Sequence, residues 1–161
     1  MNISRLFKNI KYSLYGEEKD IVKLEHNSKE VTNGSLFFCV EGRKTTGNKY
    51  INEAIERGAV AVCISEKDFY ECINIIDTTQ VSVVVVENVR NIVGLVCNNF
   101  CNASRFDFKM IGVTGTNGKT TISFMISNAL QKAGYSVGLI GTSGIFIKKS
   151  KWSSVKFVKM P

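Results

Sequence analysis

The chain has 161 residues and a formal net charge of +7, and 44% of its residues are hydrophobic and 22% are charged. This composition is typical of a globular protein, and the length allows one domain, or one small domain with part of a second. No apolar run is long enough to cross a membrane and the N-terminus lacks a signal-peptide core, so we expect a cytoplasmic protein. The lysines are scattered, which favours a solvated surface that attracts small anions over a nucleic-acid-binding surface.

Five cysteines are present, an odd number, and none of them forms a CxxC pair. The only histidine, His26, is far in sequence from the closest cysteine pair, Cys97 and Cys101. A metal site built from these residues is therefore not expected. The cysteines fall mostly inside apolar runs, which predicts buried free thiols in a reducing compartment.

The first hundred residues predict alternating helices and strands. Apolar residues at helical spacing predict a short amphipathic helix at the N-terminus: Ile3, Leu6, Phe7 and Ile10. Strands are predicted over 34–42, 59–65 and 81–87, and the β-branched run of the last suits a strand covered on both faces. Helices are predicted over 48–57 and 88–101, with Asn48 and Asn88 as N-caps and Gly58 just past the first helix. This alternation predicts an α/β layer structure with some parallel pairing.

The pattern restarts after a connector over 102–108. The predicted elements are a strand over 109–115, a helix from about Lys119 to Ala133, a strand over 135–141 and a hairpin within 144–160. The first three form a βαβ unit. We therefore expect a domain boundary near Ser104, giving domains over 1–104 and 105–161. The second domain is only begun, and apolar faces of its first elements are expected to lack cover.

A glycine-rich segment, "GVTGTNGKTT" (112–121), follows the predicted strand and opens the predicted helix. Gly115 and Gly118 permit backbone angles that let successive N–H groups face phosphate oxygens, and the helix N-terminus favours negative charge. Lys119 would reach the β- and γ-phosphates, and the Thr120 hydroxyl would bind Mg²⁺. The strict pattern G-x-x-x-x-G-K-[ST] is not met, because its first glycine falls on Val113. The alternative is a glycine-rich turn followed by a surface lysine.

This segment resembles the ATP loop of the Mur ligases, which build the peptide stem of bacterial peptidoglycan. "GLIGTSG" (138–144) resembles the next strand and turn of the same family. The front of the chain is similar to the family's uridine-binding domain in "NSKEVTNGSLFFCVEGRKTTGNKYINEAIERGAVAV" (27–62). The resemblance implies an α/β fold with a small uridine-binding domain, followed by the start of an ATP-binding central domain.

Within the family, the resemblance is best to the ligases that add a diamino acid, meso-diaminopimelate or L-lysine, to UDP-N-acetylmuramoyl-L-alanyl-D-glutamate. The ligase of the next step, which adds D-alanyl-D-alanine, shares the front domain and is an alternative. The resemblance implies ATP and Mg²⁺ as cofactors and an acyl phosphate that the incoming amine attacks.

The resemblance also implies site residues. The ATP site would include Gly115, Thr116, Asn117, Gly118, Lys119, Thr120 and Thr121, with Thr120 also on Mg²⁺. The UDP-sugar site would include His26, Ser28, Arg43, Lys44 and Thr45. The chain departs from the family pattern beside Ser28, where Lys29 replaces a usual arginine, and at Thr46, which replaces a usual aspartate. The family's substrate-binding Thr-Thr pair aligns loosely with Lys159-Met160.

In this family the Mg²⁺-binding glutamate, a carbamylated lysine and the amino-acid site come later than the segments matched here. We therefore expect that the 161-residue chain alone does not ligate and that a further segment or companion chain would complete it. Three other hypotheses stay open at this stage. They are a non-catalytic UDP-sugar-binding module, a basic nucleic-acid binder, and an unrelated P-loop NTPase. The absence of Asp and Glu after Thr121 counts against the last.

Overall fold

The computed structural model describes residues 1–42, 46–102 and 109–148. The chain divides into two compact units, Met1–Asp107 and Phe108–Pro161. Among the described residues, no helix combines the length and the apolar character needed to cross a membrane.

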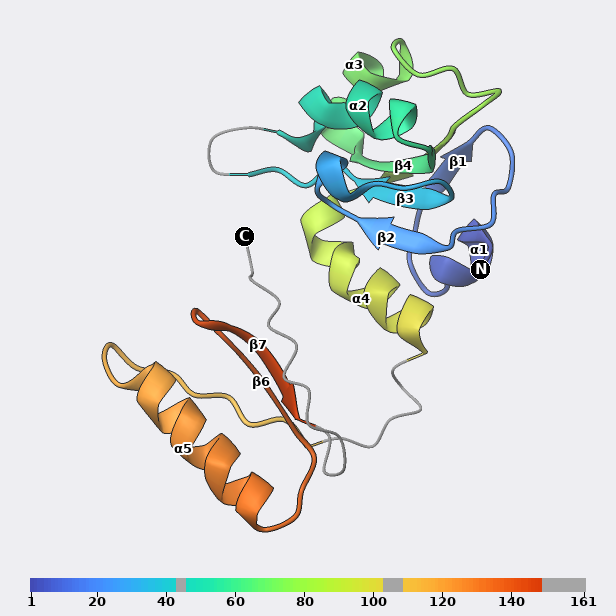
Figure 1. Cartoon of the computed structure of the whole chain (residues 1–161). Helices are drawn as coiled ribbons and strands as arrows, with labels where there is room; N and C mark the ends of the chain where they lie inside the picture. The colour runs from blue at the N-terminus through green and yellow to red at the C-terminus, as the bar shows by residue number, and fades with distance from the viewer. Residues whose placement is uncertain (43–45, 103–108, 149–161) are drawn as a thin grey trace. The chain divides into compact units, whose positions relative to one another are not determined.

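The first unit is built on a five-stranded sheet in the order β1-β5-β4-β3-β2 (Figure 1). Its strands are β1 (Ser13–Tyr15), β2 (Lys23–Glu25), β3 (Ser35–Phe38), β4 (Ala59–Ser65) and β5 (Ser82–Val86). Strands β2 to β5 run parallel, whereas β1 pairs antiparallel with β5 at the edge. The carboxyl ends of four neighbouring strands therefore meet at one edge of the sheet, which is where ligands bind in open α/β sheets.

Helices cover both faces of this sheet (Figure 1). They are α1 (Ile3–Leu6), η1 (Ser28–Glu30), η2 (Gly47–Tyr50), α2 (Ile51–Glu56), η3 (Glu66–Asp68), α3 (Phe69–Ile73) and α4 (Val89–Cys101). Along β5, Val83 and Val85 pack into the cluster that includes residues of α2 and α3, whereas Val84 and Val86 pack into the cluster of α1 and α4. The β-branched run of β5 is buried on both sides because successive side chains alternate between two covered faces.

In the first unit the structure confirms the three predicted strands and the amphipathic character of the N-terminus, where Ile3, Leu6 and Phe7 are buried. Gly58 follows α2 with a φ of 101°, as expected for the residue after a helix. The strand predicted over 34–42 is shorter in the structure, where β3 spans Ser35–Phe38. Strands β1 and β2, which have three residues each and are partly exposed, were not predicted.

Of the two predicted N-caps, Asn48 is wrong and Asn88 is confirmed in position. The residue before α2 is Tyr50, because the chain first makes the 3₁₀ turn η2, and Asn48 lies inside that turn. Its Oδ1 atom is buried without a hydrogen-bond partner among the described residues. Asn88 does precede α4, but its side chain makes no capping bond. The hydroxyl oxygen of Ser65, at the end of β4, accepts from the Val89 N–H at 3.2 Å instead.

The second unit consists of α5 (Lys119–Lys132), β6 (Val137–Gly141) and β7 (Gly144–Lys148). β6 and β7 form an antiparallel hairpin, and Phe124 of α5 meets Phe146 of β7 with ring centroids 5.0 Å apart. Residues 109–115 do not form the predicted strand, because no described residue pairs with their backbone, and the βαβ unit is therefore not formed. The second arm of the hairpin predicted within 144–160 lies outside the described residues.

Apolar side chains of the second unit are exposed, as the sequence predicts. Met110 is 84% exposed, Met125 of α5 63% and Ile140 of β6 71%. Among the described residues of this unit, Leu139 is the one large apolar residue that is buried. Large apolar side chains are thus open to solvent in the described part of this unit.

The cysteines are free, and Cys39, Cys63 and Cys72 are buried. Burial raises the pKa of the Cys63 thiol well above its ordinary value. Such thiols are inert at neutral pH. The prediction of buried thiols is wrong for Cys101, which is exposed near the end of α4.

Candidate functional site

The glycine-rich segment makes a turn that two glycines require. Gly115 has a φ of 146° and Gly118 a φ of 76°, both in the region that side chains disfavour. Gly118 directly precedes α5, whose first hydrogen bond runs from the Ile122 N–H to the Gly118 carbonyl at 2.9 Å. Gly112 is different, since an added Cβ there would meet nothing within 4 Å. The turn thus places the backbone of Gly115 to Lys119 at a helix N-terminus, which favours an anion.

Lys119 folds back over this turn. Its Nζ donates to the carbonyl oxygen of Gly115 at 2.5 Å and to that of Thr116 at 3.0 Å. An ammonium group has three donors, so one N–H stays available for an incoming phosphate oxygen. Lys119 therefore stabilises the loop through these two hydrogen bonds and places a positive charge beside the loop backbone.

The remaining predicted residues of this loop are accessible. The exposed residues include Thr116, Asn117, Thr120 and Thr121. Thr120 and Thr121 belong to the first turn of α5, which contains no acidic residue. The residues present fit a triphosphate, because they supply a lysine, hydroxyls and a helix N-terminus. Within the described ranges no group of three or more His, Cys, Asp or Glu could hold a metal.

The predicted uridine contacts His26 and Ser28 follow β2 at the carboxyl edge of the first sheet. His26 is exposed, whereas Ser28 is only 5% exposed. The Ser28 hydroxyl donates to Oε2 of Glu53 on α2 at 2.6 Å. Glu53 also accepts from Arg57 Nε at 3.3 Å through its other carboxylate oxygen. Its pKa is lowered, first by the hydrogen bond from Ser28, although burial acts in the opposite direction.

Arg43, Lys44 and Thr45 lie outside the described residues. The chain on either side of them returns on itself, since Glu41 and Thr46 form an antiparallel bridge. Gly47 lies against the backbone of β3's end, and a Cβ there would come within 2.7 Å of Cys39 Cα. Only glycine fits this close approach of residue 47 to the backbone that follows β3.

Other charged residues, which were not predicted from the sequence, lie at the same edge of the sheet. Lys67, after β4, donates to Oε2 of Glu41 at 2.6 Å, and Arg90, after β5, donates to the Glu41 carbonyl oxygen. Lys67 is 26 residues from Glu41, so no local spacing signalled the contact. The available signal was the parallel topology, which brings the residues after successive strands to one edge.

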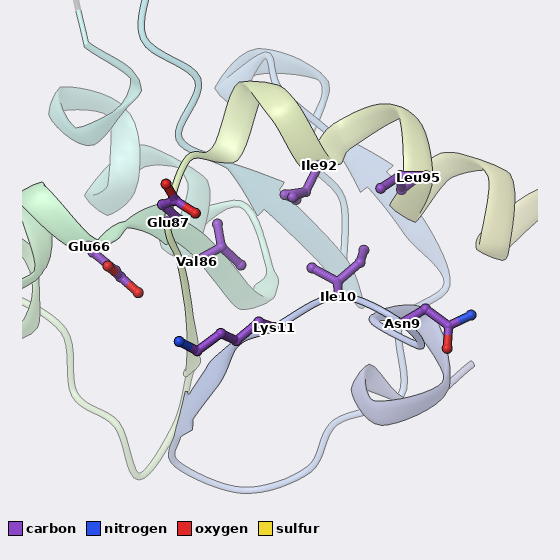
Figure 2. A pocket seen from close by; sticks show the side chains of 8 residues that line it. All are labelled: Asn9, Ile10, Lys11, Glu66, Val86, Glu87, Ile92 and Leu95. Atoms are coloured by element: carbon purple, nitrogen blue, oxygen red, sulfur yellow. The ribbon is translucent and has the colours of Figure 1, made fainter.

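A surface pocket of about 450 Å³ lies beside these strand ends. Its apolar side chains come from the loop after α1, from β5 and from α4, as Figure 2 shows for Ile10, Val86 and Ile92. Lys11, Glu66 and Glu87 supply the charged groups. None of the predicted site residues that the structure describes is among its lining residues.

Comparison with protein families gives two matches in series along the chain. Residues 20–100 match the model of the Mur ligase family, catalytic domain, and residues 113–159 match that of the Mur ligase middle domain. The chain belongs to the Mur ligase family.

The similar curated proteins are UDP-N-acetylmuramoyl-L-alanyl-D-glutamate--2,6-diaminopimelate ligases. The one from Clostridium botulinum is 39% identical over 155 residues, covering 96% of this chain and 31% of the relative. The one from Alkaliphilus oremlandii is 44% identical over 137 residues, covering 85% of this chain and 26% of the relative. The chain therefore spans less than a third of the length of these relatives.

Solved structures with the same fold include MurF from Acinetobacter baumannii. It has a TM-score of 0.62 at 16% identity and covers 88% of this chain and 29% of that one. MurF ligase from Thermotoga maritima, in complex with ADP, has a TM-score of 0.55 at 26% identity over 74% of this chain and 26% of that one. The α/β fold expected from the sequence is that of Mur ligase structures.

Proposed function

We propose that this chain is the N-terminal part of an ATP-dependent ligase of peptidoglycan synthesis. The ligase would add a diamino acid, meso-diaminopimelate or L-lysine, to UDP-N-acetylmuramoyl-L-alanyl-D-glutamate in the cytoplasm. Residues 1–104 would bind the UDP-sugar and residues 105–161 would begin the ATP-binding domain. The observation that carries the proposal is the 39% identity over 96% of the chain to a ligase named for diaminopimelate.

The choice among ligases of the family rests on sequence rather than fold. The similar structures are of MurF, which acts on a different substrate according to the name of one of them, a D-alanyl-D-alanyl ligase. The Acinetobacter baumannii structures, at 16% identity, support the fold alone. The relatives above 35% identity carry the name of the diaminopimelate ligase. The D-alanyl-D-alanine ligase is therefore the alternative.

Within the proposed ATP loop, we assign the phosphate contacts and the metal contact to different residues. The backbone N–H groups from Gly115 to Lys119 and the free N–H of Lys119 would hold phosphate oxygens and offset their charge. The Thr120 hydroxyl would contribute one ligand to Mg²⁺, which supplies charge neutralisation when bound. The other metal ligands have to come from outside the described residues, since these contain no acidic cluster.

In the first unit, His26, Ser28, Arg43, Lys44 and Thr45 would bind the UDP-sugar. Ser28 and His26 lie at the carboxyl edge of the sheet, where ligands of α/β folds bind. Arginine and lysine suit an anionic diphosphate.

Isothermal calorimetry tests both halves separately. We expect the chain to bind UDP-N-acetylmuramoyl-L-alanyl-D-glutamate and, independently, ADP with Mg²⁺. We expect no ADP release when this nucleotide-sugar, the diamino acid and Mg-ATP are mixed with the chain, because it spans 31% of its relative. Absence of UDP-sugar binding contradicts the proposal for residues 1–104. Preference for the tripeptide nucleotide over the dipeptide favours the D-alanyl-D-alanine ligase.

A second candidate is a UDP-sugar-binding module without catalysis. It fits the finding that no group of three or more His, Cys, Asp or Glu among the described residues could hold a metal. It predicts that the chain binds the UDP-sugar but does not bind ADP with Mg²⁺. Measured binding of ADP with Mg²⁺ contradicts it.

A further inference from the structure

Ser28 is held by the side chain of Glu53, which is not among the residues predicted to bind the nucleotide. Its hydroxyl donates to Oε2 of Glu53 at 2.6 Å, and the two residues are 25 positions apart. The contact depends on η1 packing against α2, where Glu53 lies one helical turn from Arg57. Ser28 is buried to 95% by these neighbours, so its hydroxyl has few orientations open to it.

The proton in this hydrogen bond belongs to the serine. Glu53 is a carboxylate, because Ser28 and Arg57 donate to its two oxygens and both contacts favour the charged form. A carboxylate can only accept, whereas a hydroxyl has one proton and two acceptor lone pairs. Because the Ser28 hydroxyl donates its one proton to Glu53 in this hydrogen bond, only its oxygen lone pairs are available to another group.

We propose, on the basis of the proposed function, that Glu53 is a positioning residue that fixes Ser28 as a hydrogen-bond acceptor for a donor group of the uridine nucleotide. Uridine has two kinds of donor, the imide N3–H of the base and the hydroxyls of the ribose. Cytosine has an unprotonated N3 at the same position of the ring. A serine locked as an acceptor therefore favours uridine if it faces the base, and favours ribose over deoxyribose if it faces the sugar.

This arrangement discriminates between ligands because a ligand without a hydrogen-bond donor opposite Ser28 would leave the serine oxygen buried and unpaired. A buried acceptor that meets no donor loses its solvation without compensation, which costs more than the bond itself contributes. A site built around a polar contact therefore rejects an analogue that lacks the contacting group. If Ser28 were free to rotate, it could donate to an acceptor instead, and this selection would disappear.

The experiment compares nucleotides on the full chain. Calorimetry measures the affinity for UDP, N3-methyl-UDP, 2′-deoxy-UDP and 3′-deoxy-UDP. We expect one of the analogues to bind about tenfold more weakly than UDP, which corresponds to the loss of one buried hydrogen bond. Loss with the methyl analogue assigns the donor to the base, and loss with a deoxy analogue assigns it to the ribose.

Substitutions then connect that loss to Ser28 and Glu53. The analogue penalty should vanish in Ser28→Ala, whereas a penalty from the bulk of the N3-methyl group would persist there. It should fall to about threefold or less in Glu53→Gln, because the amide can also donate and so frees the serine proton. Glu56→Gln, an exposed carboxylate on the same helix, is the matched control and should keep the full penalty.

The outcomes separate this inference from the proposed function. If the chain does not bind UDP, both are contradicted. If it binds UDP but shows no analogue penalty, or keeps the full penalty in Glu53→Gln, only the positioning role is contradicted. Thermal unfolding checks that Glu53→Gln is folded. Glu53→Asp is the second variant, since it keeps the charge but is too short to hold the 2.6 Å contact, and it should also lose the penalty.

Discussion

The Lys67 ammonium group lies 2.6 Å from the Oε2 atom of Glu41, and this contact joins the segments that follow β4 and β3. Arg90, in the first turn of α4 after β5, donates to the backbone carbonyl of the same Glu41. Three neighbouring parallel strands thus end in residues that converge on one position. That position lies two residues before Arg43, at the edge of the sheet where the proposed UDP-sugar site begins.

The Glu41–Lys67 contact predicts a pH effect. The pKa of Glu41 is lowered, first by the hydrogen bond from Lys67, so the charged form is favoured in the folded chain. Its contribution to stability is therefore present above the ordinary glutamate pKa and is lost as the pH falls through the lowered value. Lys67→Met should raise the Glu41 pKa toward its ordinary value, as measured by carboxyl ¹³C NMR titration. Lys8→Met, which removes an exposed lysine elsewhere, should leave that pKa unchanged; an unaltered Glu41 titration in Lys67→Met contradicts the assignment.

Lys119 gives a prediction about nucleotide binding. Lys119→Met should lower the affinity for ADP by about 10- to 100-fold, because one charged hydrogen bond contributes about 1.5–3 kcal/mol. The substitution also removes the bonds from Nζ to the Gly115 and Thr116 carbonyls, so the loop loses its brace. Lys132→Met, at the other end of α5, is the matched control and should bind ADP normally. Equal affinity of the two variants would contradict a phosphate role for Lys119.

The glycines of the loop should differ in their tolerance of substitution. Gly118→Ala forces a side chain into a left-handed conformation, which costs about 1–2 kcal/mol, and should lower both thermal stability and ADP affinity. Gly118→Asn should be milder, because asparagine adopts this conformation more readily. Gly112→Ala places its Cβ in open space and should have little effect on either measurement. A loss in Gly112→Ala as large as in Gly118→Ala would show that the loop geometry differs from the one described.

Two glycines of the first unit should respond in opposite directions. Gly94 lies in the interior of α4 with no atom within 4 Å of an added Cβ, so Gly94→Ala should stabilise the unit by about 0.5–1 kcal/mol in urea unfolding. Gly47→Ala should destabilise it, since the new Cβ would lie 2.7 Å from Cys39 Cα and neither backbone can move freely. If Gly47→Ala keeps the wild-type stability, the approach of Gly47 to β3 is looser than described.

The positions of helices and strands were predicted correctly where the pattern that identifies the element lies within one continuous segment. Strand β4 was predicted at 59–65, its observed bounds, because its apolar run is long and ends at polar residues. The start of α5 at Lys119 was predicted for the same reason, since the glycines that precede the helix are consecutive with it in the sequence. The strand predicted over 109–115 failed because a strand needs a partner, and apolar composition alone cannot supply one.

The contacts that shape the first unit's candidate site were not predictable from local patterns. Glu53 meets Ser28 and Lys67 meets Glu41 across 25 and 26 residues, and both contacts depend on how elements pack after the sheet has formed. The three-residue strands β1 and β2 were missed because they are too short and too exposed to show an alternating pattern.

The Ser65 hydroxyl that accepts from the Val89 N–H has a consequence for the order of folding. The first turn of α4 gains this partner only after β4 and β5 have paired in register, because the hydroxyl belongs to one strand and the helix follows the other. Ser65→Ala should cost about 1 kcal/mol, as loss of a cap does. We expect that cost to appear as faster unfolding rather than slower folding, since a contact that waits for the sheet forms late. The start of α4 would then serve as a kinetic marker of completed sheet assembly, measurable by stopped-flow folding of this variant.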